Sequence, residues 1–160
     1  MKQSFLIILV FMSIISSAAS CHKNDLPIRT ESNAENNLKD EIMTPTKIRI
    51  KVGSKTFTAT LLENKTAQAF KEILPLTMNL TEMNGDEKYG YLLKSLPTNA
   101  SNPGTTKKGD LMLFGSKTLV LFYQTRSTSY RYTKLGTVDD VVGLAEALGS
   151  GNVTVAFELE

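Results

Sequence analysis

The residues best suited to ligand recognition are aromatic and basic, and they fall in two stretches of the second half of the sequence. Tyrosine and phenylalanine offer apolar contact area, tyrosine adds a hydroxyl, and arginine adds a fork of donors. Together such groups are typical of a surface that binds a peptide or a small ligand. The candidate binding residues are Tyr89, Tyr91, Phe122, Tyr123, Arg126, Arg131 and Tyr132.

Two alternatives remain open for these residues. The tyrosines, Tyr130 among them, could simply pack on the sheet and its rim, and the two arginines could be solvated at a hairpin end. Neighbours on a strand face opposite sides, so only one of Phe122 and Tyr123 can face a groove.

Composition excludes several kinds of chemistry. The only cysteine is Cys21 and the only histidine is His22, so the later sequence lacks histidine-activated nucleophiles, thiol redox chemistry and metal sites built on these residues. We expect no metal and no cofactor. Asp139-Asp140 is interpreted as charge at a helix N-terminus, and Asp110 as a turn residue. The formal charge is only +2 and no basic block occurs, so we expect no nucleic-acid partner.

Cys21 has the position of a bacterial lipoprotein acylation site. Lys2 begins a short positive region, an apolar run follows from Phe5 to Ile15, and the small residues Ala18-Ala19-Ser20 lead to the cysteine. This pattern resembles a lipobox. The alternative is an ordinary secretory peptide cut near Ala19, which leaves Cys21 as a spare thiol.

Lipidation at Cys21 implies a membrane partner and a place in the cell envelope. Two or three acyl chains such as palmitate anchor a protein firmly, because each buried methylene contributes about 0.8 kcal/mol. The charged residues after Cys21 weakly resemble export signals of surface lipoproteins, so we favour the outer membrane or cell surface over the inner membrane. The expected organisation is a signal peptide over residues 1–20, a flexible tether over 21–45 and one domain over 46–160.

Most of the domain has the alternating pattern of β-strands. We predict two helices, one over 65–74 with Asn64 as its cap and Pro75 as its stop, and one running to Leu148 with Thr137 as its cap. The predicted strands are 47–52, 55–62, 77–83, 88–93, 110–113, 118–124, 130–135 and 152–159, with a long loop over 94–108 and Gly136 closing the seventh strand. Short, turn-rich strands with only two helices predict a mainly β fold, a closed eight-stranded barrel capped by two helices.

This order of elements resembles a cyclophilin-like barrel. The resemblance is carried by Phe57-Thr58-Ala59-Thr60-Leu61-Leu62 with the helix through Phe70, and by Gly109-Asp110-Leu111, the strand Leu119 to Gln124 and the corner Leu135-Gly136. It covers about residues 46–160 and is nearest to the minimal bacterial cyclophilin-like domains.

The resemblance implies peptidyl-prolyl isomerisation, in which an arginine weakens the resonance of an amide whose rotation barrier is about 18–20 kcal/mol. No arginine lies between Arg49 and Arg126, so the strand over 77–83 lacks that group, and the domain has no tryptophan or histidine. Tyr132 stands where the family has a pocket histidine.

We therefore favour a lipid-anchored binding module for a peptide or small ligand. A groove of the right shape can bind a ligand without accelerating proline isomerisation, because acceleration requires contacts that are made only in the transition state. The alternatives are a weak isomerase that uses Arg126 or Arg131, and a structural envelope protein or complex subunit. An open apolar groove would argue against the structural alternative, and a face filled by side chains would support it.

Overall fold

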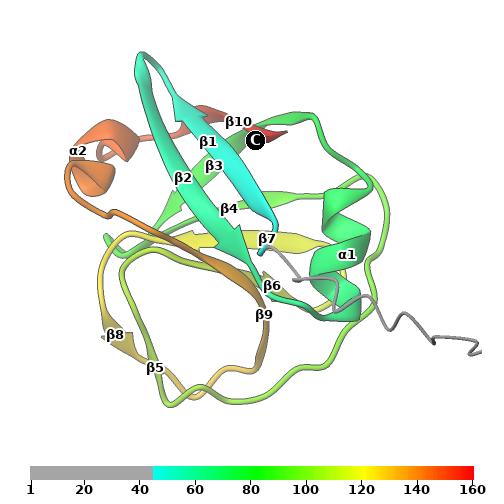
Figure 1. Ribbon diagram of the computed structural model, residues 1–160. Helices are drawn as coiled ribbons and strands as arrows, with labels where there is room; N and C mark the ends of the chain where they lie inside the picture. The colour runs from blue at the N-terminus through cyan, green and yellow to red at the C-terminus, as the bar shows by residue number, and fades with distance from the viewer. Residues whose placement is uncertain (1–44) are drawn as a thin grey trace, which may run out of the picture. The chain divides into compact units, whose positions relative to one another are not determined.

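The computed structural model describes residues 45–160, so the expected signal peptide, Cys21 and most of the expected tether lie outside the described residues. Eight antiparallel strands close into a barrel in the order β1-β10-β3-β4-β7-β6-β9-β2 (Figure 1). This confirms the predicted mainly β fold with a closed eight-stranded barrel. The barrel strands are β1 (Lys47–Val52), β2 (Lys55–Leu61), β3 (Leu76–Met83), β4 (Glu87–Tyr91), β6 (Asp110–Phe114), β7 (Thr118–Phe122), β9 (Tyr132–Val138) and β10 (Val153–Leu159).

A small second sheet lies outside the barrel. It pairs β5 (Thr105–Thr106) with β8 (Arg126–Ser127). The stretch over 94–108, predicted to be a loop throughout, therefore contains one short strand. In Figure 1 this two-stranded sheet lies at the lower left, below the barrel strands.

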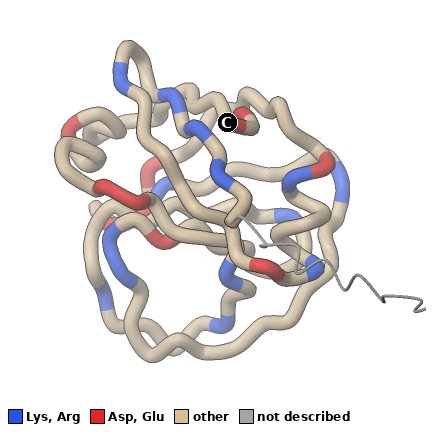
Figure 2. Tube along the Cα trace, viewed as in Figure 1, with Lys and Arg blue, Asp and Glu red and all other residues tan. Residues whose placement is uncertain are grey.

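Alternating side chains fill the barrel interior. In β1, Ile48, Ile50 and Val52 are buried while the intervening residues are basic, and Gly53 turns the chain at φ +56° into β2. Figure 2 shows these basic residues spaced along β1, and acidic residues are interspersed with basic ones over the rest of the domain. Lys47 and Lys51 form ion pairs with Asp139 and Glu158 respectively.

Both helices contribute to the same core. Helix α1 (Lys65–Lys71) begins after Asn64, whose Oδ1 accepts a hydrogen bond from the Ala67 amide at 2.8 Å. Its Phe70 packs edge-on against Phe157 of β10, with ring centroids 5.9 Å apart. Helix α2 (Leu144–Leu148) buries its first and last leucines. Within residues 45–160, no helix is long and apolar enough to cross a membrane.

The structure corrects the prediction for Gly136 and the segment after it. Strand β9 continues through Gly136 to Val138, so Gly136 does not close the strand and Thr137 does not cap a helix. A Cβ atom on Gly136 would lie 2.4 Å from the Thr60 carbonyl oxygen, so glycine here permits close approach of β2 and β9. Asp139-Asp140 consequently precedes a turn, since α2 begins only at Leu144.

One lysine is buried inside the end of the barrel. The Lys88 side chain has no exposed surface, and its Nζ donates to the carbonyl oxygens of Gly149 at 2.7 Å and Gly151 at 2.6 Å. It also forms an ion pair with Glu82, whose other carboxylate oxygen accepts from the Tyr123 hydroxyl at 2.7 Å. Lys88 therefore fastens the segment between α2 and β10 to the β3–β4 hairpin.

This cluster also explains two pKa values. Burial raises the pKa of Glu82, but hydrogen bonds from Lys88 and Tyr123 outweigh burial and leave that pKa below its ordinary value of 4.5. Burial, followed by the hydrogen bond to Glu82, raises the pKa of Tyr123. Glu82 is therefore ionised and the phenol of Tyr123 is neutral at physiological pH.

Candidate functional site

A cavity of about 540 Å³ lies on the outer surface of the barrel. Its lining comes from the end of β3 and the β3–β4 turn, from strands β4, β6, β7 and β9, from the β5–β8 sheet and from the segment that leads from β8 to β9. We call this cavity the groove. It sits on a second apolar cluster, separate from the barrel interior, that comprises Met112, Val120, Phe122 and Tyr132 with Tyr89 packed against it.

Strand register explains why these residues meet. Tyr89 on β4 is paired with Val120 on β7, and Glu87 is paired with Phe122. Strand β7 buries both of its faces, since Leu119 and Leu121 point into the barrel while Val120 and Phe122 form the floor of the groove. Its nearly continuous apolar sequence follows from this double burial.

The aromatic lining forms a connected series of rings. Tyr132 is in contact with Phe122 at a centroid distance of 5.5 Å and with Phe114 at 5.6 Å, and Phe114 contacts Tyr130 at 5.9 Å. Aromatic side chains held at such distances support one another and keep a fixed shape. The rings at the rim are accessible, because Tyr130 is 63% exposed.

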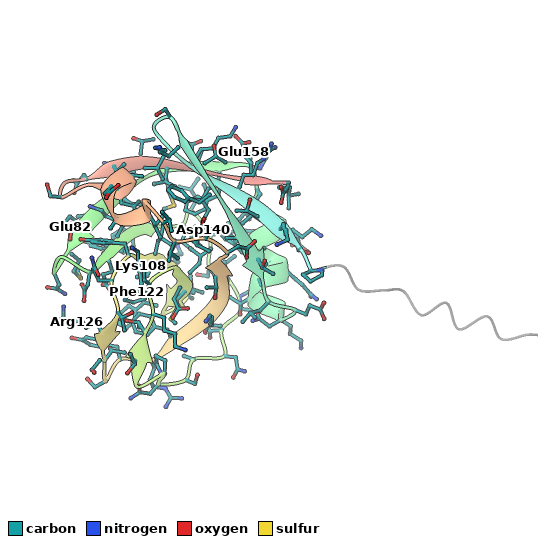
Figure 3. The ribbon with its side chains drawn as sticks, turned by 60° about the vertical axis from the view of Figure 1, so that its left-hand side comes forward. Glu82, Lys108, Phe122, Arg126, Asp140 and Glu158 are labelled. Carbon is teal, nitrogen blue, oxygen red and sulfur yellow. The ribbon has the colours of Figure 1, made fainter. Side chains whose placement is uncertain are left out.

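Arg126 reaches the groove from β8 and forms an ion pair there. Its Nη1 donates to Asp86 Oδ2 at 2.7 Å, and the Asp86 side chain is nearly buried while that of Arg126 is half exposed. Figure 3 shows Arg126 and Phe122 on the same side of the barrel. The hydrogen bond from Arg126 to Asp86 raises the pKa of Arg126 further, so its guanidinium is always charged.

Glu87 is the second carboxylate of the groove. Burial, followed by the charge of Asp86, raises the pKa of Glu87 from 4.5 to about 7, although Arg126 acts in the opposite direction. Tyr132 responds to the same surroundings, since burial and then the charge of Glu87 raise the pKa of its phenol. Glu87 therefore changes its charge near neutral pH.

The structure brings most of the sequence-predicted binding residues together. Those that line the groove are Tyr89, Tyr91, Phe122, Arg126 and Tyr132. Tyr123 instead packs with the barrel core and bonds to Glu82, so Phe122 is the member of that pair that faces the groove. Arg131 does not line the groove, and its Nη2 donates to the Ala100 carbonyl at 2.6 Å.

Sequence reasoning missed Asp86, Glu87 and Phe114, which also line the groove. Glu87 could have been found, because it precedes Tyr89 and Tyr91 by two and four residues and therefore shares their strand face. Asp86 had no such signal, since it precedes the strand and its contact with Arg126 spans 40 residues.

The structure corrects the expectation for Asp110. It is the first residue of β6, directly after the turn at Lys108 and Gly109, and its carboxylate accepts a hydrogen bond from the Lys107 amide at 2.8 Å. Within residues 45–160, no group of three or more acidic, histidine or cysteine residues is arranged to hold a metal ion.

Comparison with known proteins identifies the fold family. The model of the cyclophilin-like family matches residues 50–158, which is most of the described domain. The chain belongs to the cyclophilin-like family. A solution structure of a hypothetical protein from Archaeoglobus fulgidus is similar to it, with a TM-score of 0.57 and 18% sequence identity over 72% of this chain and 95% of that one. This likeness concerns the fold alone. No curated protein matches the sequence.

The charged groups of the groove come from the turn before β4, from β4 itself and from β8. Strand β3 (Leu76–Met83) has the sequence LTMNLTEM and therefore contributes no arginine to the groove. The guanidinium of the groove is instead that of Arg126, which approaches from β8 and is already bound to Asp86.

Proposed function

We propose that this protein is a lipid-anchored, cyclophilin-like binding module of the bacterial cell envelope, which holds a peptide or small ligand in the groove. In this proposal Cys21 carries the lipid, residues 21–45 form the tether, and the two helices cap the barrel. The observation that carries the proposal is the open cavity of about 540 Å³ over a fixed aromatic floor. Sites for small ligands have this size and combine apolar and aromatic side chains with polar groups that orient the ligand.

Exposed aromatic surface supports the same proposal. Tyr91 is 71% exposed and Phe114 is 44% exposed, and both lie at the groove. Accessible apolar patches on a soluble domain typically mark interaction surfaces. A purely structural protein would gain nothing from keeping this face open, so we favour ligand binding over the structural alternative.

The groove favours binding over catalysis because the guanidinium of Arg126 is already hydrogen-bonded to Asp86. Asp86 holds one terminal nitrogen of Arg126, which orients the guanidinium toward a carboxylate of the protein. An isomerase must place such a group where it contacts the twisted amide of the transition state. Weak isomerase activity with Arg126 as the donor remains the second candidate, and the position of Arg126 at the groove favours Arg126 over Arg131 for that role.

An isomerisation assay on a short X-Pro peptide separates these two functions. We expect amide NMR shifts at groove residues when the peptide is added, with isomerisation at the uncatalysed rate. Acceleration that is lost in Arg126→Ala and kept in Arg131→Ala would establish the isomerase instead. Arg131 is a matched control, since it is exposed and lies outside the groove.

The anchor has an independent test. We expect cells grown with labelled palmitate to label the wild-type protein and not Cys21→Ser. Labelling that persists in the variant would reject the lipid anchor and leave the groove proposal unaffected.

A further inference from the structure

The groove has an excess of acidic groups. Asp86 and Arg126 neutralise each other at 2.7 Å, but Glu87 takes part in no ion pair within residues 45–160. When Glu87 is ionised, the groove therefore carries one negative charge without a counter-ion. Such a charge in a partly desolvated cavity attracts a cation strongly.

One carboxylate oxygen of the groove has no hydrogen-bond donor in the part of the chain that the structure describes. Asp86 is 6% exposed and lines the cavity, yet its Oδ1 has no hydrogen-bond partner among the described residues. Buried carboxylate oxygens are normally satisfied by donors. This oxygen and the carboxylate of Glu87 can therefore accept hydrogen bonds from N–H donors of a ligand, since the described residues supply none to them.

The aromatic lining suits the same kind of ligand. Phe122, Tyr132, Phe114 and Tyr130 form one series of contacting rings, and Tyr89 and Tyr91 form an edge-on pair with centroids 5.8 Å apart on β4. The face of an aromatic ring attracts a positive charge, and aromatic residues grouped around a carboxylate are suited to binding organic ammonium ions.

On the basis of the function proposed above, we propose that the ligand of the groove carries an organic cation, an ammonium or guanidinium group, that binds between Glu87 and the surrounding aromatic rings. The charge, the unsatisfied carboxylate oxygen and the rings all favour a positively charged donor over a neutral or acidic group. The cation can belong to a free amine or to a basic side chain of a peptide.

This proposal makes binding depend on pH. The charged and titratable groups around Glu87 are Asp86 beside it, Glu82 on β3, Arg126 on β8 and Tyr132 on β9. Burial and the two acidic neighbours raise the pKa of Glu87 to about 7, and Arg126 opposes them. Because the ionised form attracts the cation, affinity increases as pH rises from 6 to 8.

Matched probes test the charge of the ligand. Nα-acetyl-lysine amide and its neutral analogue Nα-acetyl-norleucine amide are titrated into the full-length protein at pH 8 and followed by NMR shifts of groove residues. We expect the lysine probe to bind roughly tenfold more tightly. Glu87→Gln removes this preference, whereas Glu63→Gln, which neutralises an exposed carboxylate outside the groove, retains it.

The arms of the experiment distinguish the outcomes. Equal affinity for both probes, or a preference that survives Glu87→Gln in a folded variant, overturns the cation proposal while groove binding stands. Loss of all groove shifts with both probes rejects the proposed function as well. A third probe, butylammonium, separates the sources: comparable binding identifies a free amine as sufficient, and binding of the lysine amide alone identifies a peptide side chain.

Discussion

Glu87 destabilises the empty protein when it is ionised, and replacing it with glutamine measures by how much. The side chain is partly buried beside Asp86, and its pKa is about 7 in the folded protein against an ordinary value of 4.5. Each pKa unit corresponds to about 1.4 kcal/mol, so ionising Glu87 in the folded state costs about 3 kcal/mol at most. Glutamine keeps the shape of the side chain and cannot ionise.

The sign of the effect follows from where the protons bind. Below pH 4.5 Glu87 is protonated in both the folded and the unfolded protein, and Glu87→Gln changes the free energy of unfolding very little. Between pH 4.5 and 7 the folded protein holds the proton more tightly, so the wild type loses stability as pH rises. Above pH 7 the loss is complete, and the variant is more stable than the wild type by about 2–3 kcal/mol.

Urea unfolding at pH 4, 6 and 8.5 checks this prediction, with Glu63→Gln as the control. The exposed carboxyl of Glu63 lies outside the groove, so the difference in unfolding free energy between Glu63→Gln and the wild type stays nearly constant with pH. If Glu87→Gln were less stable than the wild type at pH 8.5, the attraction of Arg126 would outweigh burial. Ionised Glu87 would then already be stabilised in the empty groove, and the argument for a cationic ligand would fail with it.

Three further substitutions test the fold. Lys88→Met removes the cation that binds Glu82 and two glycine carbonyls, and we expect urea unfolding to give a loss of about 3 kcal/mol because buried partners are left unsatisfied. Gly136→Ala places a methyl group against the Thr60 backbone and costs about 3 kcal/mol by the same measurement. In Gly90→Ala the new methyl group meets only the ends of two flexible side chains at under 3 Å, so we expect a loss of about 1 kcal/mol. If Gly90→Ala were as destabilising as Gly136→Ala, the role given to the backbone contact at Gly136 would be contradicted.

Most of the barrel could be predicted from local sequence because its strands alternate. The hairpin from Lys47 to Leu61 pairs as expected, since its apolar residues all point inward and Gly53 supplies the turn. The helix at Asn64 follows from its cap, but it ends at Lys71 rather than at residue 74. Local patterns thus located the elements, and their ends depended on tertiary packing.

The sequence could not predict features that depend on distant contacts. Glycine is a residue type that often ends a strand, and the sequence predicts that Gly136 does so. Its close contact with β2 instead makes it part of a continuous strand. The alternation of β4 points Lys88 into the barrel interior, where a lysine is rarely found unless hydrogen-bond partners satisfy its ammonium group. Two of its partners, the carbonyl oxygens of Gly149 and Gly151, are about 60 residues away in the sequence. The pair of Asp86 with Arg126 is hidden for the same reason.

The charge of the groove also separates recognition from catalysis. A donor that assists proline isomerisation must offer a proton to the amide nitrogen, and an ionised carboxylate has none. If protonated Glu87 acted as that donor, isomerisation of an X-Pro peptide would slow as pH rises through about 7. If Arg126 acted, the rate would stay constant, because its guanidinium keeps its charge.

The binding proposal predicts a different pH profile. The lysine amide probe binds more tightly as pH rises from 5.5 to 8.5, because Glu87 gains the charge that attracts the ammonium group, and X-Pro isomerisation stays at the uncatalysed rate throughout. Titrations and isomerisation assays on the same samples give both profiles. Catalysis that weakens while pH rises would identify Glu87 as a proton donor in the groove and would reverse the role assigned to it here.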